Sequence, residues 1–285
     1  MAREAVITSH TNHRSEAVRI MGWNASTPTK TVLVIHHGLG EHIGRYQSLA
    51  DHLSDVPIHV YGYDAVGHGE SGGKRGDAAG FDGLAADLRQ MIGVILEASG
   101  AEHVILFGHS MGAGVVAHSL ATGTPHAAIR GVVLSAPPVE IHRTALINVK
   151  IALGRVLARV APRVTLSNEI DHANISSVQA EIDRYARDPL VHDRISLRLA
   201  ASLIDEAAAL PERVGKVTLP LLLYQGVDDG VVQIRGTRRL AETWGGEVEL
   251  EEFEGARHET HHETPEIVGT LMAKMREWLT PHLSS

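Results

Sequence analysis

The sequence predicts an α/β protein with a mostly parallel central sheet, flanked by helices and interrupted by an inserted helical cap. Two observations support this fold class. Strand-like and helix-like runs alternate over residues 31–136 and again over 219–279, which is the pattern of a parallel sheet covered on both faces. Residues 137–210 break the alternation, with several helical stretches and no convincing strand. We therefore expect a core formed by residues 1–136 and 211–285, and a cap, or lid, formed by residues 137–210.

The strands are expected from the spacing of apolar side chains. Residues 17–23 alternate apolar and polar side chains, as a half-buried strand does. Residues 31–36 are continuously apolar from Val32 to Ile35, which indicates a strand buried on both faces. The further strands expected along the chain are 58–64, 103–107, 131–135, 219–225 and 247–253.

Three helices are expected between or after these strands. Residues 81–99 carry an apolar face at helical spacing, and residues 113–121 are small and apolar. Thr264 followed by Pro265 predicts the start of a last helix that runs to Leu279, because proline is favoured at the first helical position.

Composition narrows the function classes. The chain has 285 residues, of which 44% are hydrophobic, and a formal net charge of −8. This charge argues against nucleic-acid binding, which needs concentrated positive charge. The absence of cysteine excludes disulfides, thiolate metal sites and cysteine nucleophiles. Residues 1–14 are polar, so we expect no signal peptide, and no run is long enough to span a bilayer; a cytoplasmic protein is expected.

The most informative motif is Gly-His-Ser-Met-Gly at residues 108–112, between an expected strand and an expected helix. This arrangement describes a nucleophile elbow, in which a strained turn exposes the serine hydroxyl. Glycine is needed on both sides because larger side chains would collide in so tight a turn. The alternative interpretation is an ordinary helix N-cap. With its strand and helix context, Ser110 is the candidate nucleophile.

A serine nucleophile needs a base, and the base needs an acid that orients it. Asp228 and Asp229 follow an expected strand, and His258 follows the next strand along the chain. Their order after Ser110 is the order serine, acid, histidine. Adjacent aspartates point in different directions, so only one can face the histidine, and the residues alone leave both open. The chain has 19 histidines, so position, rather than residue type, distinguishes His258.

An acyl-transfer site also needs donors for the oxyanion. His-Gly-Leu-Gly at residues 37–40 follows the strand at 31–36 and lets the Leu39 N–H turn toward a substrate oxygen. The N–H of Met111, directly after the nucleophile, is the expected second donor. The alternative for residues 37–40 is a simple strand-to-helix turn.

Two other motifs fit their patterns only in part. Residues 67–72 match Gly-x-Gly-x-x-Gly, but a loop follows where a dinucleotide-binding fingerprint requires a helix. Residues 258–262 match His-Glu-x-x-His, but Gly255 and Pro265 flank them too closely for the helix on which a zinc site of this type depends. We therefore expect neither a nucleotide cofactor nor a metal.

One segment of the cap, Ile141 to Arg163, is basic and amphipathic. It carries five cationic side chains and no acidic one, with an apolar stripe that includes Val156 and Val160. Such a helix either contacts an anionic membrane or guides an acyl chain, or it packs over the core with its arginines in solvent. Both interpretations stay open here.

Taken together, the motifs resemble the monoacylglycerol lipase and lysophospholipase branch of the α/β-hydrolases. The resemblance extends from about residue 31 to residue 279, although most of the cap from 139 to 177 matches poorly. The matching segments are residues 37–42, 44–46, 64, 67–71, 73–76, 108–112, 134–137, 188–191 and 254–258. Two departures from the pattern are Val66, where arginine is usual, and Ala113, where a third glycine is common.

The resemblance implies an α/β-hydrolase fold and a serine ester hydrolase that needs no cofactor. The family pattern Gly-x-x-Asp falls on Gly226 and Asp229, which implies Asp229 as the acid; it also implies Leu39 and Met111 as oxyanion donors. The implied substrate is a monoacylglycerol, and the alternatives are a lysophospholipid or another short-to-medium acyl ester. An aminopeptidase, a zinc protease and a binding protein without catalysis are the remaining alternatives.

Overall fold

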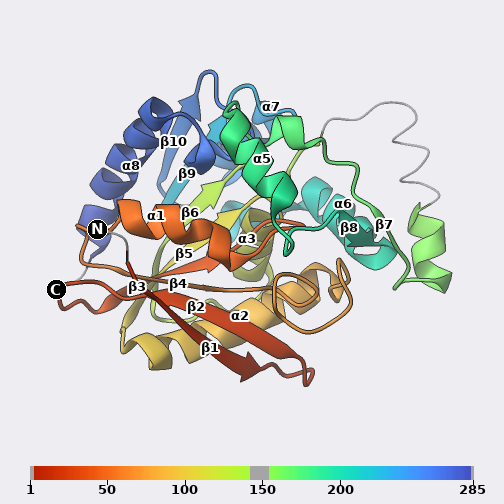
Figure 1. Ribbon diagram of the computed structural model, residues 1–285, viewed down its shortest axis with the longest axis horizontal. Helices are drawn as coiled ribbons and strands as arrows, with labels where there is room; N and C mark the ends of the chain where they lie inside the picture. The colour runs from red at the N-terminus through yellow and green to blue at the C-terminus, as the bar shows by residue number, and fades with distance from the viewer. Residues whose placement is uncertain (1–2, 142–153, 284–285) are drawn as a thin grey trace.

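The computed structural model describes residues 3–141 and 154–283, and its centre is an eight-stranded sheet (Figure 1). The strands are β1 (Ala5–Thr11), β2 (Ala17–Trp23), β3 (Thr31–His36), β4 (His59–Tyr63), β5 (His103–His109), β6 (Ile129–Ser135), β9 (Leu221–Gly226) and β10 (Val248–Phe253). In space they follow the order β1-β2-β4-β3-β5-β6-β9-β10. The pairs β1–β2 and β2–β4 are antiparallel, and all later neighbours are parallel. The mostly parallel α/β-hydrolase sheet expected from the sequence is confirmed.

Helices cover both faces of this sheet. They include α1 (Gln47–His52), α2 (Gly80–Ser99), α3 (Met111–Thr122), α5 (Gln179–Arg187), α6 (Leu197–Arg213), α7 (Ile234–Thr243) and α8 (Pro265–Leu279). Helices α1 and α8 lie on one side of the sheet, and α2 and α3 on the other (Figure 1). As expected, Thr264 caps α8, its side chain accepting the Ile267 N–H.

The continuous apolar runs of the sequence are explained by this double covering. In β3, Val32 and Val34 belong to the apolar core that contains α2 and α3, whereas Leu33 and Ile35 belong to the core that contains α1 and α8. Because successive side chains of a strand point to opposite faces, a strand that is buried on both faces cannot alternate in polarity. The rigid sheet that results positions the loops at its carboxyl edge.

Some elements were not expected from the sequence. Strand β1 lies at the edge of the sheet and its residues are mostly exposed, so its sequence lacks the apolar pattern that a buried strand shows. The short helix α1 and the helix α7 were also missed. The ends of several expected strands differ from the observed ends by one or two residues, as for β6, which begins at Ile129.

The segment 137–210, which we call the cap, contains two short strands, so the expectation of no strand there was wrong. Strands β7 (Thr165–Ser167) and β8 (Arg194–Ser196) pair antiparallel in a small separate sheet. Three residues are too few to show a period of two in the sequence. In Figure 1, β7, β8 and α6 lie together to the right of the main sheet.

Much of the basic amphipathic segment expected at Ile141 to Arg163 falls outside the described residues, which resume at 154. Residues 154–160 are helical. Val156 and Val160, two members of the expected apolar stripe, have 58% and 78% of their surface exposed, so this part of the stripe does not pack against the core. Within the described ranges, we find no helix with both the length and the apolar character needed to cross a bilayer.

Candidate active site

Ser110 occupies a strained turn between β5 and α3. Its backbone dihedrals are φ +51° and ψ −120°, a region that residues with a side chain seldom adopt. A Cβ atom on Gly112 would lie 2.0 Å from the carbonyl oxygen of His36, and one on Gly108 would lie 2.6 Å from Cα of Ala113. Both flanking positions therefore require glycine, as expected for a nucleophile elbow.

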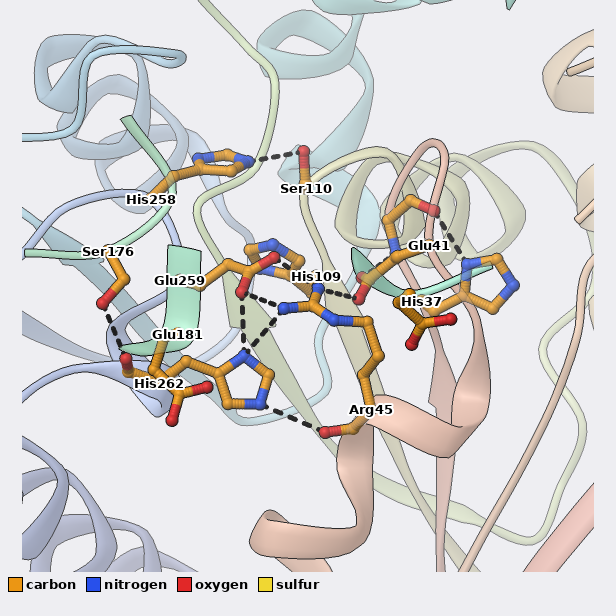
Figure 2. Close-up of polar contacts among 12 residues, drawn as sticks. His37, Glu41, Arg45, His109, Ser110, Ser176, Glu181, His258, Glu259 and His262 are labelled. Carbon is orange, nitrogen blue, oxygen red and sulfur yellow. Dashed lines mark hydrogen bonds and ion pairs between the residues drawn. The ribbon is translucent and has the colours of Figure 1, made fainter. Parts of the chain in front are cut away.

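The structure brings Ser110, His258 and Asp229 together, although they lie on three separate loops at the carboxyl edge of the sheet. Nε2 of His258 lies 2.9 Å from Oγ of Ser110, and a dashed line marks this contact in Figure 2. Nδ1 of the same ring lies 2.8 Å from Oδ2 of Asp229. Asp228, by contrast, is exposed to solvent, whereas only 5% of Asp229 is exposed.

The carboxylate of Asp229 is held by its own loop. Its Oδ1 accepts the backbone N–H groups of Val231 and Val232 at 2.8 and 2.9 Å. Its Oδ2 also accepts an N–H from the side-chain amide of Gln225 at 2.9 Å. These donors fix the direction of the carboxylate, so that it can orient the imidazole and stabilise positive charge on it.

The environment of His258 favours its charged form. Burial by itself lowers the pKa of His258, but the nearby carboxylate of Asp229, and its hydrogen bond, raise that pKa above the ordinary value. The neighbouring His109 behaves oppositely: burial and the proximity of His258 hold its pKa well below the ordinary value. Of the two rings, only that of His258 is suited to accept a proton from Ser110.

The two expected oxyanion donors, Leu39 and Met111, line the same pocket as Ser110. Met111 is the first residue of α3, and N–H groups in the first helical turn have no partner within the helix. The Gly38 N–H donates to Oε1 of Glu41 at 2.6 Å, and this hydrogen bond fixes the loop that carries Leu39. His37 supports the same loop: its Nε2 accepts the Ala65 N–H at 2.9 Å.

The pocket above Ser110 has a volume of about 390 Å³ and combines an apolar wall with a polar segment. Its apolar wall comes from both core and cap: Leu39, Met111, Pro138, Ile141, Ile195, Ala200, Leu203, Ile204, Val231 and Val232. Its polar side chains come from one stretch of the cap: Ser167, Asn168, Glu169, Asp171 and Asn174. Pockets of this kind bind molecules with an apolar part and a few polar groups.

Residues 258–262 and 67–72, which match a zinc motif and a dinucleotide-binding motif in part, do not lie on the helices that those motifs require. Thr260–His262 form only a single turn of 3₁₀ helix, so His258 and His262 do not share the face of an α-helix. Among residues 3–141 and 154–283, no group of three or more histidine and acidic side chains is arranged to hold a metal. Residues 67–72 are followed by turns that continue to α2, and no helix begins within the motif.

A buried charged cluster beneath the site was not expected from the sequence. Arg45 lies between Glu41 and Glu259 (Figure 2), and its guanidinium donates to Oε2 of Glu41 at 2.8 Å. The ring of Tyr185, from the cap, lies 4.5 Å from the guanidinium carbon. Arg45 and Glu259 are 214 positions apart, so no local pattern could pair them.

The chain is similar to several known hydrolases. Residues 27–265 match the family described as serine aminopeptidase, S33. The monoglyceride lipase of Mus musculus is 30% identical over 265 residues, which cover 92% of this chain and 86% of the mouse protein. The monoacylglycerol lipase of Mycolicibacterium smegmatis is 30% identical over 264 residues, 92% of each chain. The crystal structure of Paleococcus ferrophilus monoacylglycerol lipase has a TM-score of 0.82 and 34% identity, and covers 93% of this chain and 99% of that one.

Proposed function

Because this chain belongs to the serine aminopeptidase S33 family of hydrolases, we propose that it is a serine ester hydrolase that cleaves monoacylglycerols to glycerol and a fatty acid. The observation that carries the proposal is the relay from Ser110 through His258 to Asp229, with atom separations of 2.9 and 2.8 Å. This relay lies at the base of a pocket that has both apolar and polar walls.

The reaction proceeds through an acyl-enzyme. His258 takes the proton of Ser110, and the serine oxygen attacks the ester carbonyl while the N–H groups of Leu39 and Met111 stabilise the oxyanion. The carbonyl–oxygen bond to the alcohol then breaks, and His258 gives its proton to the departing glycerol oxygen. A water molecule, deprotonated by His258, attacks the acyl-enzyme and releases the fatty acid and free Ser110. Asp229 orients the imidazole and stabilises its charge throughout.

The shape of the pocket supports an amphipathic ester as substrate. An acyl chain fits the apolar wall formed by core and cap, and a polyol fits the polar side chains of the cap. The similarity to the monoglyceride lipase of Mus musculus and the monoacylglycerol lipase of Mycolicibacterium smegmatis favours glycerol as the alcohol. A lysophospholipase or a general carboxylesterase is the alternative within the same chemistry, and the cap, residues 137–210, would act as the lid that selects among them.

A panel of esters tests the proposal. Monoacylglycerols of graded chain length are compared with a lysophospholipid and with simple alkyl esters, and kcat/KM is measured for each. We expect the highest kcat/KM for a monoacylglycerol, labelling of Ser110 by a fluorophosphonate, and no loss of activity with a metal chelator. A protein that neither reacts with the fluorophosphonate nor turns over any ester would refute the proposal.

A second candidate is an aminopeptidase, as the description of the family suggests. Such an enzyme needs cap carboxylates that face the amine of its substrate, and Glu169 and Asp171 of the cap do line the pocket. One oxygen of Asp171, however, accepts the backbone N–H of Ala173 at 2.9 Å. Turnover of an amino-acid anilide in preference to a monoacylglycerol would favour this candidate.

The enzyme works, on this proposal, in the cytoplasm and makes transient contact with a membrane surface through its cap. The exposed side chains of Val156 and Val160 support this contact, together with the exposed Arg159 in the same helical stretch. Apolar side chains flanked by cations are typical of segments that insert shallowly into anionic membranes. Such contact would bring the pocket to substrates that are dissolved in the membrane.

A further inference from the structure

Part of the cap lies along the loop that carries His258. We call residues 173–177 the cap arm. The backbone N–H of His258 donates to the carbonyl oxygen of Asn174 at 3.2 Å, and that of Glu259 donates to the carbonyl oxygen of Ile175 at 2.8 Å. Asn174 also lines the substrate pocket. The cap arm therefore contacts the candidate base on one side and the substrate space on the other.

Glu263 joins the cap arm to this loop through its carboxylate. Its Oε1 accepts the backbone N–H of Arg257 at 2.9 Å and the backbone N–H of Ser177 at 2.8 Å. Its Oε2 accepts the hydroxyl of Ser177. Only 6% of Glu263 is exposed, so its carboxylate has little contact with water. Hydrogen bonds to an ionised acceptor are stronger than those between neutral groups.

Further hydrogen bonds tighten the same contact. The hydroxyl of Ser176 donates to the carbonyl oxygen of His262 at 2.8 Å, as Figure 2 shows. The guanidinium of Arg257 donates to the carbonyl oxygens of Ala173 and Ser176. The loop from Arg257 to Glu263 is thus held by the cap as well as by the core.

From these contacts we propose that Glu263 is a positioning residue for His258. Its carboxylate fixes the backbone N–H of Arg257, the residue directly before the histidine, to the cap arm, and so keeps the imidazole in line with Ser110. This inference rests on the proposed function, because it assigns to Glu263 a task in the same reaction. A displacement of about 1 Å in a reacting group can cost on the order of 100-fold in rate. The loop that carries His258 therefore needs hydrogen bonds that hold it in position.

The decisive variant is Glu263→Leu, which keeps the bulk of the side chain and removes both acceptor oxygens. The N–H groups of Arg257 and Ser177 then lose their partner, and the loop can shift. We expect kcat on a soluble p-nitrophenyl ester to fall by roughly 10- to 100-fold, with KM within about threefold of the wild-type value. The downfield proton resonance of the hydrogen bond between His258 and Asp229 should weaken or move upfield.

Glu263→Gln is the rescue variant. Its amide oxygen can accept both N–H groups, and its NH₂ group can donate to the Ser177 hydroxyl, so we expect kcat within about threefold of wild type. The matched control is Glu266→Leu, the same change at an exposed position three residues further on, which should leave kcat and the resonance unchanged.

Each outcome decides the question. Wild-type kcat in Glu263→Leu, or a rise in KM alone, overturns the inference. If Glu263→Leu does not fold, Ser177→Ala takes its place; it should lower kcat by about two- to fivefold with KM unchanged, and unchanged kcat overturns the inference.

The rate of reaction with a fluorophosphonate distinguishes a failure of the proposed function from a failure of the role proposed for Glu263. If the wild type fails to react, the proposed function itself is wrong. If wild type and Glu263→Leu react equally fast, only the role of Glu263 is wrong.

Discussion

Arg45 forms a bidentate ion pair with Glu259, the residue that directly follows His258 in the chain. The two guanidinium nitrogens of Arg45 lie 2.6 and 2.7 Å from the two carboxylate oxygens of Glu259. Burial raises the pKa of Glu259, but Arg45 more than offsets this and holds that pKa well below its ordinary value. Since Arg45 also binds Glu41, whose other oxygen accepts the Gly38 N–H, the pair connects the loop of Leu39 with the loop of His258.

Replacement of Ser110, the proposed nucleophile, should abolish turnover without unfolding the protein. We expect Ser110→Ala to lower kcat by roughly 10⁴- to 10⁶-fold, because no other hydroxyl can take its place in the strained turn. The measurement is hydrolysis of a monoacylglycerol, with the thermal unfolding midpoint as a check on folding. Retention of more than about one per cent of wild-type kcat would mean that another residue is the nucleophile.

Substitution of Asp229 should lower kcat far more than the same substitution of its neighbour Asp228. Asp229→Asn should lower kcat by about 10⁴-fold, because an amide cannot stabilise the imidazolium or hold the correct tautomer. Asp228→Asn is the matched control, since Asp228 is exposed and should tolerate the change. Comparable losses in both variants, or a greater loss in Asp228→Asn, would show that the assignment of the acid is wrong.

The dependence of kcat/KM on pH should reflect the environment of His258. The ring must be neutral to accept the Ser110 proton, and Asp229 raises the pKa of His258 above the ordinary value of 6.5. Activity should therefore rise with pH through a midpoint above 6.5. A pH–rate profile with a soluble ester tests this, and a midpoint below that value would contradict the direction of the shift.

His118 should make the stability of the fold depend on pH. Its ring nitrogens lie 2.8 Å from a carboxylate oxygen of Glu206, in α6, and 2.9 Å from one of Asp82, in α2. Burial lowers the pKa of His118, but Glu206 and then Asp82 raise it above the ordinary value overall. Because the folded pKa is the higher one, the stabilisation is complete below about pH 6.5 and is lost as the pH rises through the folded pKa.

Thermal unfolding of His118→Gln tests this dependence. The variant should be less stable than wild type at low pH, and the difference should shrink at high pH. His126→Gln, at an exposed position, serves as the control. A difference between wild type and His118→Gln that is the same at every pH would show that the imidazolium does not contribute.

Membrane contact should depend on the two exposed valines of the cap. The double variant Val156→Ser, Val160→Ser should bind vesicles of anionic phospholipid roughly tenfold more weakly, because burial of apolar side chains drives insertion. Its kcat on a soluble ester should not change. The control is Val6→Ser, Ile7→Ser, which alters two side chains on β1 that are 46% and 57% exposed. Equal vesicle binding by wild type and both variants would refute the contact.

Local features of the sequence were sufficient to predict the elbow and the central sheet except for its edge strand β1. Ser110 could be predicted as the candidate nucleophile because its strained turn requires glycine two residues before it and two residues after it. Both glycines are close to Ser110 in the sequence, so a short motif reveals the turn. The buried strand β3 could be recognised because its burial on both faces leaves a continuous apolar run. Strands β7 and β8 were missed because three residues carry no such period.

The sequence by itself therefore determined the fold class, the elbow and the order of serine, acid and histidine along the chain. The residues alone left Asp228 and Asp229 both open, and the family resemblance implied Asp229. Only the tertiary structure decided the contact itself, because the turn of the loop after β9 brings Asp229 to His258. It also decided that Arg45 meets Glu259 and that Glu263 meets Ser177. These residues look like ordinary charged or polar surface residues in the sequence, and their partners are set by the packing of distant segments rather than by any local pattern.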